Sequence, residues 1–258
     1  MGTTALKFFD CNTCIGRPAA LPPLADTVRM DHTAEQLIEA LDRAGIEGAL
    51  VWHVAQRDYD ARAGNDLVAR AIAPHGRLAG CWSILPPQTG ELGDLDAFFA
   101  AAGRAGVRAV RAFPKAHRYL FRAEVLRPVM DRLVAARMPL IVSLEQTSWD
   151  DLYDLLADEP ELTVILTGMG CWGTDRYLRP LFERYPNVAA DVSSYIVDGG
   201  IEAVVADYGP GRLVFGTGFP LAYHGAPMLM VAHAEIPPEA KEAIASGNLE
   251  RMMAGVRP

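Results

Sequence analysis

Two cysteines near the start of the chain are spaced in a way that could do chemistry. Residues 8–17 read FFDCNTCIGR and contain the pair Cys11-x-x-Cys14. Such a pair can be a redox dithiol or half of a metal site, and redox pairs normally lie at a helix N-terminus. Here the pair lies in an apolar, strand-like run, where side chains alternate between faces. We therefore expect Cys11 and Cys14 to point in opposite directions, and Asp10, Asn12 and Cys14 to share a face.

Polar residues also stand at the ends of later apolar runs. His53 could act as a general base, although we favour a histidine bonded to a neighbouring backbone carbonyl. Only one of Trp52 and His53 can face inward. Arg111 could hold a carboxylate through two hydrogen bonds or form a structural ion pair. Glu145, on the same side as Ser143, could pair with Arg111, which we favour, or act as an acid or base whose pKa is raised by burial.

Cysteine and histidine side chains give further candidates. Cys14 could be a nucleophile if a base such as His53 lies close to it, but a lone inward cysteine is more often a small core residue. His53, His117 and His224 follow strand-like runs and could converge on one face. Because histidines often meet by chance in such folds, we do not favour a new metal site there.

Four tryptophans lie at or after the ends of apolar runs, namely Trp52, Trp82, Trp149 and Trp172. Aromatic walls fit a small organic ligand. The alternative is that these rings simply pack over the end of the fold. Trp82 and Trp172 are the two that we take as candidate ligand-binding residues.

Eight short apolar runs alternate with helical patterns and must position these side chains. The runs cover residues 6–14, 48–54, 76–85, 106–113, 139–145, 162–168, 187–194 and 212–218. Near-continuous apolar strands, each followed by a helix, indicate a parallel sheet covered by helices. Eight units predict one closed (β/α)₈ barrel of the TIM type over residues 1–258. An open doubly wound sheet is the alternative, but no glycine-rich phosphate fingerprint supports it.

The helical patterns carry recognisable end signals. Thr33 with Gln36 predicts an N-terminal capping box, and Gly45 predicts the end of the same helix. Pro128 predicts the first turn of a later helix. The proline-rich segment 17–30 is expected to be a long first loop, on the face that carries function in such barrels.

Composition limits the classes of partner. The 258 residues carry a net charge of −8, with 22% charged residues and no run of basic residues, so we expect no binding to nucleic acid. No apolar run is long enough for a membrane span, and the first residues lack the pattern of a signal peptide, so we expect a cytoplasmic protein. Four cysteines do not suggest a disulfide framework.

Several segments together resemble the amidohydrolase superfamily, in particular its branch of metal-dependent hydrolases and carboxylate decarboxylases. Residues 10–16, DCNTCIG, align with the strand-1 pattern D-x-H-x-H-x-G. RMPLIVSLEQT, LTVILTGMGCW, NVAADVSSY and RLVFGTGFPL resemble the segments of strands 5, 6, 7 and 8, and GNLERMM resembles the closing helix. The resemblance covers nearly the whole chain and implies a (β/α)₈ barrel with its site at the carboxyl ends of the strands.

The metal-binding positions of that pattern carry other residues here. The two strand-1 histidines correspond to Asn12 and Cys14, the strand-5 ligand falls near Ser143, the strand-6 histidine corresponds to Gly168, and the strand-8 aspartate corresponds to Gly218. Glycine offers no side-chain ligand, and asparagine is a poor ligand for a catalytic transition metal. The resemblance therefore implies a degenerate, metal-free site, and we expect no cofactor.

Two functions follow from this resemblance. The first is a hydrolase or lyase that acts on a small carbonyl or carboxylate compound without the metal of the family. Its candidate catalytic residues are His53, Glu145 and Cys14, and its candidate substrate-binding residues are Asn12, Arg111, Ser143, Trp82, Trp172 and His224. The second is a catalytically inactive relative that serves as a small-molecule-binding or partner subunit. In either case the expected partner is a small molecule, and the chain could form a homo-oligomer.

Overall fold

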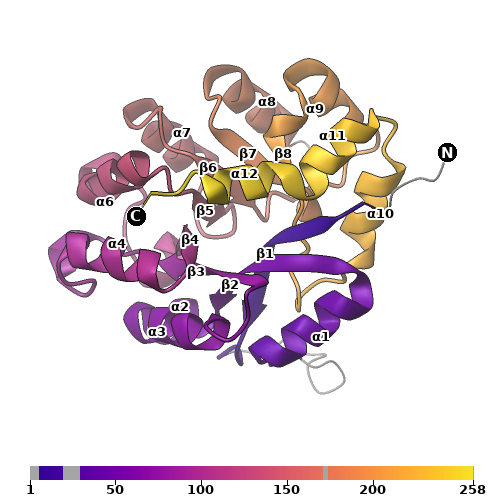
Figure 1. Cartoon of the computed structure of the whole chain (residues 1–258). Helices are drawn as coiled ribbons and strands as arrows, with labels where there is room; N and C mark the ends of the chain where they lie inside the picture. The colour runs from indigo at the N-terminus through magenta and orange to yellow at the C-terminus, as the bar shows by residue number, and fades with distance from the viewer. Residues whose placement is uncertain (1–5, 20–29, 171–173, 258) are drawn as a thin grey trace.

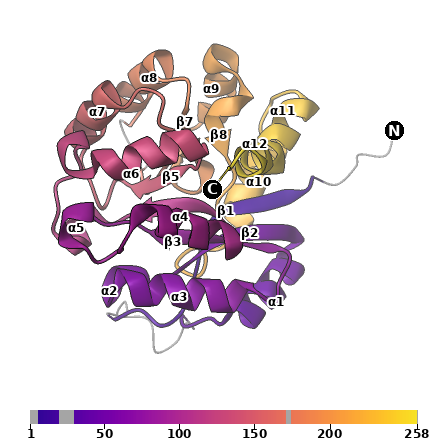
Figure 2. The same ribbon diagram turned by 60° about the vertical axis from the view of Figure 1, so that its left-hand side comes forward.

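The computed structural model describes residues 6–19, 30–170 and 174–257 and has eight parallel strands in the sheet order β1 to β8. The strands are β1 Phe8–Ile15, β2 Ile46–His53, β3 Leu78–Ser83, β4 Val107–Ala112, β5 Leu140–Ser143, β6 Val164–Thr167, β7 Val188–Asp191 and β8 Leu213–Val214. Each strand overlaps one of the eight predicted runs. The predicted (β/α)₈ barrel is thus confirmed, with its helices outside the ring of strands (Figures 1 and 2).

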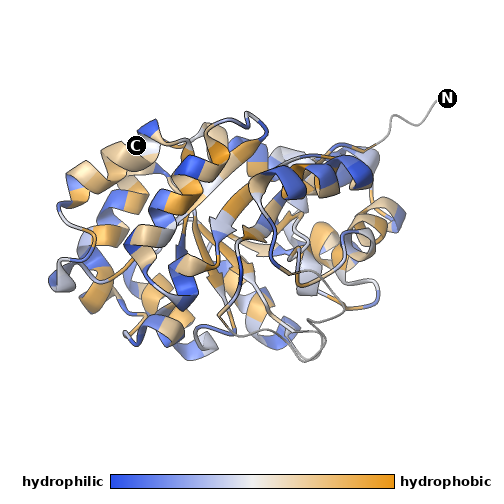
Figure 3. Ribbon diagram, turned by 90° about the horizontal axis from the view of Figure 1, so that it is seen from below, coloured by the Kyte–Doolittle hydropathy of each residue, from blue (hydrophilic) through white to orange (hydrophobic). Residues whose placement is uncertain are grey.

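Helices follow every strand. They are α1 Ala34–Ala44, α2 Ala55–Asp58, α3 Ala61–Ile72, α4 Leu95–Arg104, α5 Pro114–His117, α6 Ala123–Ala136, α7 Trp149–Asp158, α8 Asp175–Arg184, α9 Gly200–Tyr208, α10 Gly225–His233, α11 Pro238–Glu242 and α12 Asn248–Ala254. Figure 3 shows largely hydrophobic strands at the centre and helices that mix hydrophobic and hydrophilic residues. None of the helices in the described ranges is long and apolar enough to cross a membrane.

Two helices test the predicted end signals. At α1 the capping box of Thr33 and Gln36 is present, and Gly45 ends the helix at φ 75°, both as predicted. The prediction that Pro128 lies in a first helical turn is wrong, because α6 begins at Ala123 and Pro128 lies inside it. The good helix-forming residues at 123–127 extend the helix toward its N-terminus, at the cost of the one backbone hydrogen bond that proline cannot donate.

The barrel closes between β1 and the segment that follows β8. The amide of Cys11 donates to the Phe215 carbonyl at 2.9 Å, and the amide of Gly218 donates to the Asn12 carbonyl at 2.9 Å. The buried carboxylate of Asp10 reinforces this seam, because it accepts from the amide of Thr217 at 3.0 Å and from its hydroxyl at 2.5 Å. The same carboxylate also accepts from the amide of Asn12 at 2.9 Å. We call this group of Asp10, Asn12 and Thr217 the seam cluster.

A bulge in β1 changes the faces of its side chains. The pairing with β2 shifts by one residue between Asp10 and Thr13, which interrupts the alternation of side chains. The prediction that Cys11 and Cys14 point in opposite directions is therefore wrong, since both belong to the cluster of buried residues inside the barrel. Asp10 does not share a face with Cys14 either. Asp10 and Thr13 pair with Ala49 and Val51, which lie two residues apart on β2, so Asp10 shares the face of Thr13.

Candidate functional site

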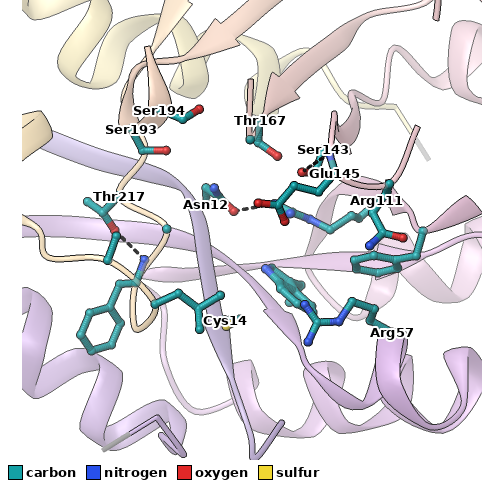
Figure 4. A pocket seen from close by; sticks show the side chains of 18 residues that line it. Asn12, Cys14, Arg57, Arg111, Ser143, Glu145, Thr167, Ser193, Ser194 and Thr217 are labelled. Atoms are coloured by element: carbon teal, nitrogen blue, oxygen red, sulfur yellow. Dashed lines mark hydrogen bonds between the residues drawn. The ribbon is translucent and has the colours of Figure 1, made fainter. Parts of the chain in front are cut away.

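A cavity of about 220 Å³ opens at the carboxyl ends of the strands. This is the end of the barrel at which the loops after the strands meet. Figure 4 labels ten of the residues that line the cavity. They come from β1, α2 and β4, from the last residues of β5 and β6, and from the segments that follow β5, β7 and β8: Asn12, Cys14, Arg57, Arg111, Ser143, Glu145, Thr167, Ser193, Ser194 and Thr217. Of the predicted site residues, the structure brings Asn12, Cys14, Arg111, Ser143 and Glu145 together in this cavity.

Arg111 is the buried cation of this cavity. Its residue is only 5% exposed, and its guanidinium donates to the Asn12 side-chain oxygen at 2.9 Å. The side-chain amide of Asn12 in turn donates to the carboxylate of Asp191 at 3.0 Å. This carboxylate also accepts from the hydroxyl of Ser193 at 2.7 Å. The Nε atom of Arg111 is buried without a hydrogen-bond partner. No ion pair in the described part of the chain involves Arg111, so its guanidinium is free of a carboxylate partner there and can bind an anion.

Trp52 forms a wall that carries two guanidinium groups. The Cζ atoms of Arg111 and Arg57 lie 5.2 Å and 5.5 Å from the centre of its ring, which is the range of a cation–π contact. Arg57 differs from Arg111 because it makes two hydrogen bonds to the carboxylate of Asp58, at 2.5 and 3.1 Å. The hydrogen bond to Asp58 raises the pKa of Arg57. The two cations beside Trp52 therefore differ in whether a carboxylate already pairs with them.

The opposite wall carries Ser143 and Glu145, which follow from β5. The Ser143 hydroxyl accepts a hydrogen bond from the Glu145 amide at 3.2 Å, and Figure 4 shows the Glu145 carboxylate pointing into the cavity. The ion pair of Glu145 with Arg111 that the sequence favoured is absent from the ion pairs of the described residues. Gly168 makes room for this wall, because a Cβ atom there would lie 2.3 Å from the Ser143 hydroxyl, and its φ of 62° favours glycine.

Cys14 lines the cavity but is a weak candidate for a nucleophile. Its residue is 4% exposed, and burial raises the pKa of its thiol to about 12. The reactive form of cysteine is the thiolate, which is scarce at neutral pH when the pKa is so high. Cys14 thus contributes shape and a soft surface to the cavity.

His53 lies outside the cavity, and Trp52 takes the inward position. The ring of His53 packs against Gly16, whose Cβ would lie 2.4 Å from the ring, and its Nδ1 accepts from the Ala55 amide at 3.0 Å. Burial lowers the pKa of His53. The side-chain alternation of β2 thus allows only one of the two residues to reach the cavity. The backbone partner of Nδ1 is the Ala55 amide and not the carbonyl that we expected.

Two other predicted residues, Trp82 and His224, are not among the described residues that line the cavity. Trp82 packs against Phe98 of α4, with ring centres 5.3 Å apart. His224 stacks on Phe219 at 4.4 Å and is buried, and its pKa is lowered chiefly by that burial. Trp172 falls outside the described residues. Trp82 faces the surrounding helices because it alternates with residues that point inward on β3.

Arg57 is the charged residue among the described lining residues that the sequence did not predict. It lies in the four-residue helix α2 directly after β2 and belongs to no motif. The only signal in the sequence was its place three to four residues beyond a strand end, followed at once by Asp58. Such a dipeptide is common on surfaces, and only the fold places it beside Trp52.

The described residues that line the cavity do not form a ligand set that fits a catalytic metal. Across the described ranges, no group of three or more His, Cys, Asp or Glu side chains is placed to hold a metal ion. The lining residues provide the carboxylate of Glu145 and the thiol of Cys14, whose high pKa opposes the thiolate form that binds metals. Catalytic zinc sites use three protein ligands of these types.

Comparison with known proteins places this chain in a family. The model of the amidohydrolase family matches residues 15–253, which include every strand from β2 to β8. The chain belongs to the amidohydrolase family. A search of curated proteins finds no significant match.

Solved structures show the same barrel. The 5-carboxyvanillate decarboxylase of Sphingomonas paucimobilis is 15% identical with a TM-score of 0.78, covering 98% of this chain and 100% of the other. The 2,6-dihydroxybenzoate decarboxylase of Rhizobium is 14% identical with a TM-score of 0.77, covering 97% and 99%. A putative 2-pyrone-4,6-dicarboxylic acid hydrolase of Pseudomonas putida is 17% identical with a TM-score of 0.68, covering 99% and 100%. At these identities the likeness establishes the fold.

Proposed function

We propose that this amidohydrolase-family barrel binds a small organic carboxylate in the cavity and hydrolyses a carbonyl compound there without a catalytic metal. The single observation that carries the proposal is the incomplete set of hydrogen-bond partners around the buried side chain of Arg111. Its guanidinium is buried beside the cavity, and its Nε atom has no partner. A buried charge with unsatisfied hydrogen-bonding capacity is costly unless a ligand completes it. A carboxylate fits this guanidinium because it can accept two parallel hydrogen bonds.

Glu145 is the candidate general base. Its carboxylate points into the cavity that Arg111 borders. As a water oxygen bonds to the carbonyl carbon, a water proton passes to Glu145. When the carbon–oxygen bond of an ester or lactone then breaks, Glu145 returns that proton to the departing oxygen. Positioned acid–base groups of this kind contribute about 10²–10⁴ in rate, and the named neighbours act on carboxylate-bearing compounds by their titles.

A binding role without turnover is the second candidate. The observation that favours it is that Glu145 is the one carboxylate among the described residues that line the cavity. General acid–base catalysis often divides its two roles between two groups. With a single such group, the barrel could serve as a small-molecule-binding or partner subunit.

Titration calorimetry with 2-oxopentanoate and with 2-pentanone, which lacks the carboxylate, tests the binding step. We expect 2-oxopentanoate to bind and 2-pentanone not to bind. Arg111→Met should weaken the binding of 2-oxopentanoate by about 30-fold or more, as when one partner of a buried charge pair is lost. Arg108→Met is the matched control, because Arg108 lies on the same strand, is only partly buried and lines no part of the cavity. Equal binding of both probes, or no effect of Arg111→Met, would contradict the proposal.

Hydrolysis is tested separately with a panel of carboxylate-bearing lactones and esters. Glu145→Gln should lower turnover by about 100-fold or more and leave the binding of 2-oxopentanoate nearly unchanged. Carboxylate binding without turnover of any panel member would support the second candidate.

A further inference from the structure

A small side pocket adjoins the main cavity and has a different character. Its volume is about 70 Å³, and it is lined by apolar or soft side chains together with Arg57. Cys14, Trp52, Arg57 and Leu221 line both spaces, so the side pocket and the main cavity share a wall. The two spaces are therefore adjacent.

Arg57 does not make the side pocket a second anion site. Its guanidinium donates two hydrogen bonds to the Asp58 carboxylate, which also accepts one from the backbone amide of Ala19 at 3.0 Å. A ligand carboxylate placed here would have to compete with Asp58 and would lie close to its negative charge. Arg111, by contrast, has no carboxylate within ion-pair distance in the described part of the chain. The two spaces thus select one anionic group and one apolar group.

We infer that the side pocket is an apolar subsite for the same ligand whose carboxylate Arg111 binds, an inference that rests on the proposed function. The ligand class is a small monocarboxylate with a short apolar arm. A cavity of about 150 Å³ holds benzene, so a pocket of about 70 Å³ takes a short alkyl or methoxy group and excludes a ring. Dicarboxylates are disfavoured, because their second charge would enter a pocket whose cation is already paired.

The experiment measures affinity for straight-chain 2-oxo acids from pyruvate to 2-oxooctanoate, with 2-oxoglutarate as the dicarboxylate matched to 2-oxopentanoate. Each added methylene that enters the side pocket should tighten binding about fourfold, and the gain should stop once the pocket is full. 2-Oxoglutarate should bind more weakly than 2-oxopentanoate. Affinity that is independent of chain length, or tighter binding of 2-oxoglutarate, would overturn the inference.

Two variants address the side pocket itself. Met30 and Val54 line it and do not line the main cavity. Met30→Trp should remove the chain-length dependence and leave pyruvate affinity nearly unchanged, while Val54→Ile, a smaller change, should bring the plateau to a shorter chain. Leu229→Trp, at an exposed position that lines neither space, is the control and should change nothing. Chain-length dependence that persists in both Met30→Trp and Val54→Ile would overturn the inference.

The results separate failure of the subsite from failure of the proposed function. If 2-oxo acids bind through Arg111 with no gain along the series, only the side-pocket inference is wrong. If no acid of the series binds, or if Arg111→Met leaves their affinities unchanged, the proposed function is wrong and the side-pocket inference falls with it.

Discussion

Asp10 and Arg111 are both buried charged residues near the carboxyl end of the barrel, but their surroundings differ. Asp10 is fully buried, and its carboxylate accepts three hydrogen bonds within the seam cluster. Arg111 is 5% exposed and donates to Asn12, yet its Nε atom has no partner. Asn12 links the two, because its backbone amide donates to Asp10 and its side-chain oxygen accepts from Arg111.

In the function proposed above, this difference distinguishes a group that stabilises the fold from a group that binds a ligand. Buried polar groups are normally satisfied within the protein, so the complete set of partners around Asp10 indicates a role in barrel closure. The incomplete set around Arg111, beside a cavity, supports the binding role proposed for it. The comparison predicts large effects on stability at Asp10 and small ones at Arg111, with the reverse order for ligand affinity.

The largest effect on stability is expected for Asp10→Ala. The substitution leaves the amides of Asn12 and Thr217 and the hydroxyl of Thr217 without their acceptor. At about 1–3 kcal/mol for each buried group left unsatisfied, the free energy of unfolding should fall by about 3 kcal/mol or more in urea denaturation. Asp66→Ala, at an exposed aspartate on α3, serves as the control. A loss below about 1 kcal/mol would show that the seam cluster does not close the barrel.

The pH dependence of stability sharpens the same point. Burial is the largest cause that raises the pKa of Asp10 from 3.8 to about 7. The folded state then binds more protons than the unfolded state between about pH 4 and about pH 7. The stabilisation that comes from protonation of Asp10 is therefore full below that window and is lost as pH rises through it. Asp10→Asn should remove this slope. Denaturation at intervals across the window, with wild type and variant compared, measures the difference, and parallel curves would contradict the prediction.

Much of the fold could be predicted because its signals are local. Eight apolar runs and the capping box at Thr33 depend on residues close together in the sequence, and both are present. Parallel strands also bring their carboxyl ends to one side, which is why Asn12, Arg111 and Glu145 meet in one cavity as expected.

The remaining features depend on contacts that no local pattern contains. The bond between Asp10 and Thr217 joins residues 207 positions apart. The bulge in β1 is a register shift against β2, a strand more than 30 residues away in the sequence, so strict alternation gave the wrong faces for Cys11 and Cys14. Arg57 reaches the cavity from a helix rather than a strand end, where the expected pattern placed no functional side chain.

The smallest effect on stability is expected for Arg111→Met, which tests the other half of the comparison. Methionine keeps much of the volume beside Trp52 and removes a charge whose desolvation is incompletely compensated. It also leaves the Asn12 side-chain oxygen without its donor, which costs about 1 kcal/mol. These terms oppose each other, so the free energy of unfolding in urea should change by no more than about 1 kcal/mol, even though carboxylate binding is lost. A loss of about 3 kcal/mol or more, the size expected when a buried ion pair is broken, would instead make Arg111 a structural residue like Asp10, and the asymmetry between the seam cluster and the cavity would disappear.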